Sequence, residues 1–185
     1  MALNVFLELI EIKAKTASVI PFLLGMCFSK FYYHQLNWQL ALIFFIAMFL
    51  FNMVVDMFDN YCDYYHADSK SYQEKTNIIG RENINPKLVL GLIIGFSVIS
   101  ALLGLYLVSQ AGLPVLWMGI FCFAVGYLYS FGLHPISSLP LGELFSGFTM
   151  GSVIVILAVY INVFDKVTFN WAFVWPILLA SGLSA

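Results

Sequence analysis

The sequence predicts an all-α protein, a polytopic bundle of helices that cross a membrane. Of its 185 residues, 62% are hydrophobic and 10% are charged, whereas soluble domains carry about 25% charged residues. The mean hydropathy is +0.92. The apolar runs are also continuous and long enough for membrane-spanning helices, which need about 20 residues. The strands of a membrane barrel would instead alternate apolar and polar residues.

Five complete spans and the beginning of a sixth are predicted in order along the chain. The sixth begins near Trp171 and is still running at Ala185, where the sequence ends. We therefore expect one transmembrane domain over residues 1–185 that is truncated at its C-terminus. Residues 1–15 mix acids with apolar residues at helical spacing, which is typical of an amphipathic surface helix and not of a signal peptide. The five complete spans are predicted near residues 16–34, 38–58, 87–108, 113–132 and 141–163.

The distribution of positive charge predicts the orientation. Cytoplasmic loops of membrane proteins are enriched in Lys and Arg. Lys30 and Lys166 lie on one predicted side, and the other Lys and Arg residues lie on the opposite side. We expect a multi-pass protein of the cell (cytoplasmic) membrane, with its N-terminus and the 59–86 loop in the cytoplasm. The residues on that side are Lys13, Lys15, Lys70, Lys75, Arg81 and Lys87.

Several classes of function are not indicated. The formal net charge is −2, and no basic patch suggests a nucleic-acid partner. Cys27, Cys62 and Cys122 are scattered, so neither a zinc site nor a disulfide framework is predicted. No obligate protein partner is predicted either.

A stripe of polar residues ends the second span. Asn52, Asp56, Asp59 and Asp63 are spaced 4, 3 and 4 residues apart, so a helix places them on one face. Ionisable residues inside membrane helices are costly and usually functional. Carboxylate and amide oxygens suit Mg²⁺, which is usually held by one or two carboxylates together with substrate phosphates. The stripe therefore predicts an anchor for a metal–diphosphate complex at the cytoplasmic surface.

Two simpler interpretations of the acids stay open. Acids at the end of a span often mark its exit into water. The acids could also form surface ion pairs with the cations of the 59–86 loop, and such pairs contribute little to stability.

The same stretch, "NMVVDMFDNYCD" (52–63), resembles the first aspartate motif of the UbiA superfamily of membrane prenyltransferases. Within it, the chain is most similar to the 1,4-dihydroxy-2-naphthoate polyprenyltransferases of menaquinone biosynthesis. Three further stretches resemble that group: "KAKTASVIPFLLG" (13–25), "IGRENINPK" (79–87) and "YLYSFGLHPISSLPLGE" (127–143). One departure is Val55, which stands where the family often has asparagine.

The resemblance implies transfer of a polyprenyl group from its diphosphate to an aromatic acceptor, assisted by Mg²⁺. It implies that Asn52, Asp56 and Asp59 bind the metal and are catalytic, with Asp59 alternatively orienting the other two. The same resemblance and the predicted cytoplasmic face supply the candidate substrate-binding residues. These are Lys13, Lys15, Asp63, Lys70, Arg81 and Tyr129.

The second aspartate motif of the family, DxxxD, is missing from these residues. After Glu143 the only acid is Asp165. An inactive or partial remnant of a prenyltransferase, or a non-catalytic cation-binding membrane protein, is therefore the alternative prediction. A CDP-alcohol phosphotransferase is not favoured, because the DG and AR pairs of its signature are absent from the stripe.

Overall fold

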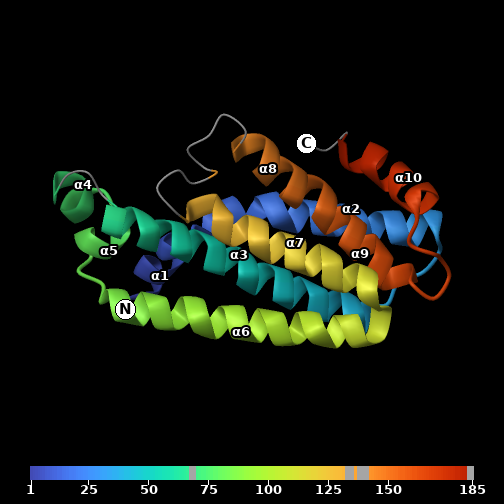
Figure 1. Cartoon of the computed structure of the whole chain (residues 1–185), viewed down its shortest axis with the longest axis horizontal. Helices are drawn as coiled ribbons and strands as arrows, with labels where there is room; N and C mark the ends of the chain where they lie inside the picture. The colour runs from blue at the N-terminus through green and yellow to red at the C-terminus, as the bar shows by residue number, and fades with distance from the viewer. Residues whose placement is uncertain (67–69, 132–135, 137–141, 183–185) are drawn as a thin grey trace.

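The computed structural model describes residues 1–66, 70–131, 136 and 142–182, and the elements in them are helical throughout (Figure 1). This confirms the predicted all-α class. The N-terminal part contains α1 (Leu3–Leu9), η1 (Ile12–Lys15), α2 (Thr16–Tyr32) and α3 (Trp38–His66). Then follow α4 (Lys70–Lys75), α5 (Ile78–Arg81), α6 (Pro86–Ala111) and α7 (Leu113–Ser130). The last part holds α8 (Gly142–Phe148), the π-helical turn η3 (Thr149–Val153), α9 (Ile154–Val163) and α10 (Trp171–Gly182).

Five helical segments are long and apolar enough to cross a membrane, as predicted. They are Ile12–Tyr32, Trp38–His66, Pro86–Ala111, Leu113–Ser130 and Gly142–Val163. The segment Trp171–Gly182 is shorter. The observed ends fall close to the predicted ones except in α3.

Helix α3 continues through His66, eight residues beyond the predicted end of its span at residue 58. Its 29 residues correspond to about 43 Å at 1.5 Å per residue, whereas the hydrocarbon core of a bilayer is about 30 Å thick. The helix predicted to carry the stripe as far as Asp63 thus ends at His66, so the connection between the second and third spans begins later than residue 59. The first residues of the predicted loop 59–86 form the end of α3, and α4 and α5 follow.

The bundle is organised around two pairs of helices. Helix α3 packs along α6, and α2 packs along α9 (Figure 1). Gly25 permits the second contact, because a Cβ at this position would lie 2.6 Å from the Cβ of Ala158. The larger apolar core lies between α2, α3, α9 and α10, and a smaller core joins α1 and α5 to α3 and α6.

The short helices α1, α4 and α5 gather at one end of the bundle (Figure 1). Asn77 ties them to α3: its Oδ1 accepts from the backbone N–H of Ile79 at 2.9 Å, and its Nδ2 donates to the carbonyl of Asn60 at 2.9 Å. Arg81 donates to Glu8 at 2.6 Å, linking α5 to α1. These contacts fold the connection between α3 and α6 onto the end of the bundle.

Candidate functional site

Lysine 15 meets the polar stripe of α3 inside the protein. Lys15 is 2% exposed and Asn52 is 8% exposed. The Lys15 Nζ donates to Asn52 Oδ1 at 2.9 Å and to the backbone carbonyl of Asn52 at 3.1 Å. It also forms an ion pair with Asp56 Oδ2. A buried charge is costly unless it is paired and hydrogen-bonded, so these contacts explain how a lysine is accommodated here.

The backbone around this cluster is held by short-range hydrogen bonds. Lys15 ends η1, where the hydroxyl of Ser18 donates to the Lys15 carbonyl at 3.0 Å. One turn beyond Asp56, the Nδ2 of Asn60 donates to the Asp56 carbonyl at 3.1 Å and reaches toward the Leu9 carbonyl at 3.5 Å. The start of α2 and the end of α1 are thus both fixed against the same part of α3.

Aspartate 59 has a different partner. Its Oδ1 accepts a hydrogen bond of 2.6 Å from the hydroxyl of Ser130, the last residue of α7. Hydrogen bonds of this length to an ionised oxygen are among the stronger kinds. Aromatic rings lie alongside: the Phe58 centroid is 5.2 Å from that of Tyr127 and 6.4 Å from that of Phe131.

Aspartate 63, two turns further along α3 than Asp56, is exposed. Its Oδ2 accepts from the hydroxyl of Tyr72 on α4 at 3.2 Å. Burial raises the pKa of Tyr72, and the neighbouring Asp63 raises it further. The sequence suggested a metal or a basic loop residue as the partner of Asp63, and the structure places a phenol there.

In the described part of the chain, the remaining predicted residues form no hydrogen bond or ion pair with Lys15, Asn52 or Asp56. Lys13 and Lys70 are exposed. Arg81 is paired with Glu8 and with Glu82, the latter at 3.1 Å, and not with the acids of α3. Tyr129 is half-buried near the end of α7. Residues 132–135 and 137–141 of the stretch 127–143 lie outside the described residues.

Sequence reasoning missed Ser130 and Tyr72 as partners of the acids. Ser130 lies in the stretch 127–143, which resembles the prenyltransferase group. No local sequence pattern connects this serine with Asp59, which lies 71 residues earlier. Tyr72 is only 9 residues from Asp63. It was missed because the 59–86 connection was interpreted as a loop.

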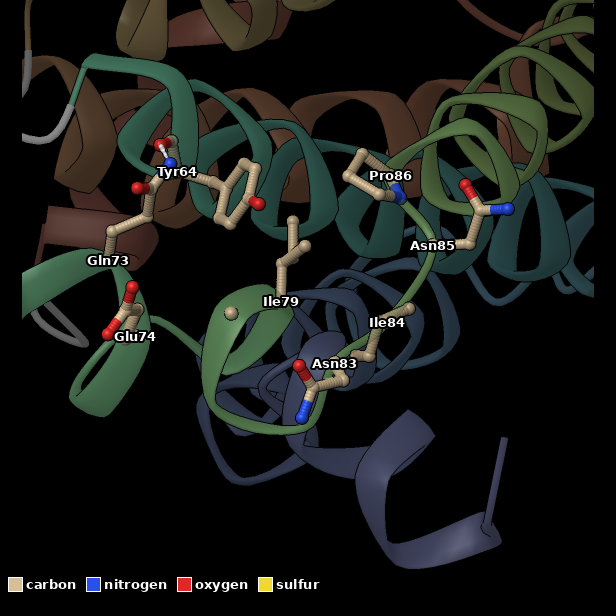
Figure 2. Close-up of a pocket in the computed structure, with 9 residues that line it drawn as sticks. Tyr64, Gln73, Glu74, Ile79, Asn83, Ile84, Asn85 and Pro86 are labelled. Carbon is tan, nitrogen blue, oxygen red and sulfur yellow. Dashed lines mark hydrogen bonds between the residues drawn. The ribbon is translucent and has the colours of Figure 1, made fainter. Parts of the chain in front are cut away.

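A cavity of about 430 Å³ lies beside the stripe, between α4, α5 and the beginning of α6. Figure 2 shows Tyr64 and Gln73 on one side of it and Asn83, Asn85 and Pro86 on the other. Asn52 and Asp56 do not line it. The cavity therefore belongs to the folded α4–α5 connection and is separate from the buried cluster.

The donor atoms on α3 suit a hard divalent cation. Asn52, Asp56 and Asp59 offer only oxygen ligands, and Mg²⁺ in proteins is usually bound by one or two carboxylates with phosphate oxygens and water completing its shell. Within the described ranges, no three acidic, His or Cys side chains come together closely enough to hold a metal by themselves.

The model of the UbiA prenyltransferase family matches residues 18–184. The chain belongs to this family. Members of the UbiA family generally depend on a divalent metal, in keeping with the oxygen ligands on α3. Asn52 and Asp56 lie within the matched region, and Lys15 lies three residues before it.

A curated relative of this UbiA chain is the 1,4-dihydroxy-2-naphthoate octaprenyltransferase of Bacillus subtilis (strain 168). The two are 33% identical over 157 residues, which cover 82% of this chain and 49% of the relative. The chain therefore spans about half the length of the curated relative that it matches. No solved structure matches it at a significant level.

Proposed function

We propose that this chain is part of a membrane enzyme that transfers a polyprenyl group from polyprenyl diphosphate to an aromatic acceptor. The proposed acceptor is 1,4-dihydroxy-2-naphthoate, and the proposed pathway is menaquinone biosynthesis. The observation that carries the proposal is the buried cluster of Asn52, Asp56 and Lys15 in a chain of the UbiA family. The activity for which the Bacillus subtilis relative is named supports the choice of acceptor.

The proposed metal is Mg²⁺, with Asn52, Asp56 and Asp59 as its protein ligands. When bound, Mg²⁺ would supply a Lewis acid that offsets the negative charge developing on the departing diphosphate. The carboxylates fix where the diphosphate binds, and Ser130 fixes the orientation of Asp59 through its 2.6 Å hydrogen bond. Positioning of this kind is a large part of what an enzyme contributes to a transfer reaction.

The rings beside Asp59 suit the prenyl group. Departure of diphosphate leaves positive charge on the allylic carbon, and aromatic faces stabilise a cation within about 6 Å. The ring of Phe58, which precedes Asp59 in α3, packs against Tyr127 and Phe131, which lie near Ser130 in the chain. The residues predicted to bind substrate are the proposed contacts to the diphosphate and the acceptor. These are Lys13, Lys15, Asp63, Lys70, Arg81 and Tyr129.

We further propose that the end of the bundle with α1, α4 and α5 faces the cytoplasm. Lys13, Lys70, Lys75 and Arg81 lie on or beside these short helices. The opposite end carries Lys166, next to Asp165, which accepts a hydrogen bond of 2.8 Å from Gln35. An excess of Lys and Arg on one side favours the cytoplasm for that side.

The proposal is tested by measuring prenyl transfer in membranes that contain the protein. Labelled polyprenyl diphosphate, 1,4-dihydroxy-2-naphthoate and Mg²⁺ are supplied, and the prenylated product is measured. Asp56→Asn is expected to lower the rate about a hundredfold or more, because it removes a charged ligand of the metal. The matched control is Asp165→Asn at the opposite end of the bundle, which is expected to retain activity.

Two results would refute the proposal. One is transfer that proceeds equally well in Asp56→Asn. The other is a folded protein that binds the cation and transfers no prenyl group to any aromatic acceptor, as expected of the non-catalytic cation-binding protein named above.

A further inference from the structure

The ammonium group of Lys15 contacts oxygen atoms of Asn52 and Asp56, two of the residues proposed as metal ligands. An ammonium carries three donor hydrogens and no acceptor. In the structure the Lys15 Nζ contacts Asn52 Oδ1, the Asn52 carbonyl and Asp56 Oδ2. Asn52 and Asp56 are therefore engaged by a cation that belongs to the protein.

The surroundings explain why an internal cation is needed. The Asp56 side chain is 17% exposed. Its neighbours on α3, Met53, Val54 and Met57, are all buried. A carboxylate in such a place is costly unless an opposite charge is paired with it. Lys15 provides that charge from a different helix, across a sequence separation of 37 residues to Asn52.

We propose that Lys15 is a built-in counter-cation, which holds Asn52 and Asp56 in place before a divalent cation arrives. Binding of the divalent cation displaces the ammonium from Asp56. The ammonium then becomes a ligand for the diphosphate. This inference rests on the proposed function, because it takes Asn52 and Asp56 as ligands of the metal.

The construction of the site suits such an exchange. Two cations cannot share one carboxylate oxygen without strong repulsion, since like charges a few ångströms apart in a medium of low polarity oppose each other. The Lys15 backbone is fixed at the junction of η1 and α2. Its side chain is a flexible four-carbon stem, so the ammonium can move while the helices stay packed.

The experiment measures the binding of Mn²⁺, a paramagnetic substitute for Mg²⁺, to the purified protein in detergent by electron paramagnetic resonance. Lys15→Met removes the competing charge and keeps an apolar stem. We expect it to bind Mn²⁺ about tenfold more tightly than the unaltered protein, because a unit positive charge no longer opposes the metal. Lys15→Gln is neutral and still hydrogen-bonds to Asn52, so it repeats the test if Lys15→Met does not fold. Lys30→Met, which changes an exposed lysine in the last turn of α2, is the matched control and should bind as the unaltered protein does.

A second titration adds inorganic pyrophosphate at saturating Mn²⁺. If the displaced ammonium binds the diphosphate, Lys15→Met should bind pyrophosphate about tenfold more weakly, the loss expected for one charge-assisted contact. The substitution Lys15→Met is therefore expected to change the two affinities in opposite directions: tighter binding of Mn²⁺ and weaker binding of pyrophosphate. A lysine with a purely structural role would not produce this pattern.

Unchanged or weaker Mn²⁺ binding in both Lys15 variants would overturn the inference. If Asp56→Asn still abolished binding and transfer, the proposed function would stand and Lys15 would be a permanent partner of Asp56. If the unaltered protein and both Lys15 variants bound no Mn²⁺ and transferred no prenyl group, the inference and the proposed function would fail together.

Discussion

Replacing Lys15 by methionine removes the positive charge beside Asp56 while leaving most of the lysine stem in place. Removing one partner of a buried ion pair costs about 3–5 kcal/mol, because the other charge stays buried without compensation. Lys15 is 2% exposed, but the Asp56 side chain is 17% exposed. Water reaches the remaining carboxylate, and we therefore expect Lys15→Met to lower the free energy of unfolding by about 2–4 kcal/mol.

The double variant Lys15→Met/Asp56→Leu separates the ion pair from the general cost of substitution. With both charges gone, no buried charge is left unpaired, and much of the stability should return. We expect the two single changes to be non-additive by about 2 kcal/mol or more. Unfolding by SDS in mixed micelles, followed by tryptophan fluorescence, measures each free energy in the absence of divalent cations.

The control is Lys13→Met, which changes an exposed lysine and should stay within about 0.5 kcal/mol of the unaltered protein. A cost below about 1 kcal/mol for Lys15→Met, or single costs that add within about 0.5 kcal/mol, would refute the reasoning. In that case the contacts of Lys15 with Asn52 and Asp56 would not act as a buried ion pair.

Two further predictions concern the contacts that surround the cluster. Ser130→Ala removes the hydrogen bond to Asp59 and should lower kcat/KM for prenyl transfer about tenfold, the loss expected for one bond to a charged group. The exposed Ser109→Ala is its control, and equal activity of the two variants would contradict the role of Ser130. Gly25→Leu forces a side chain against Ala158 and should lower the free energy of unfolding by about 1–3 kcal/mol. Gly119→Ala, where a Cβ would meet nothing within 4 Å, is the control in the SDS assay, and an equal cost at both positions would show that Gly25 is not a close contact.

The end of α3 shows why the sequence placed one boundary wrongly. Hydropathy falls after residue 58 because Asp59, Asn60 and Asp63 follow, and the span was therefore ended there. Each of these side chains is hydrogen-bonded in the continued helix: Asp59 accepts from Ser130, Asn60 donates to the carbonyls of Asp56 and Leu9, and Asp63 accepts from Tyr72. A hydropathy pattern locates the membrane boundary, but the helix ends where its backbone hydrogen bonds end.

The sequence by itself determined the helices that cross the membrane and the face of α3 that carries Asn52, Asp56, Asp59 and Asp63. Both follow from local rules: a run of about 20 apolar residues spans a bilayer, and residues three or four apart share one face of a helix. Neither rule predicts which residues of different helices come into contact.

Only the tertiary structure decided which residues meet this face. Lys15 lies 37 residues before Asn52, and Ser130 lies 71 residues after Asp59. Their contacts depend on how η1, α2 and α7 pack against α3, and packing is set by the shapes of many side chains together. The sequence alone predicts Lys15 as a positive residue of the cytoplasmic side and a candidate substrate contact. Packing places it inside the protein, where the half-buried Asp56 provides the opposite charge that a buried lysine requires.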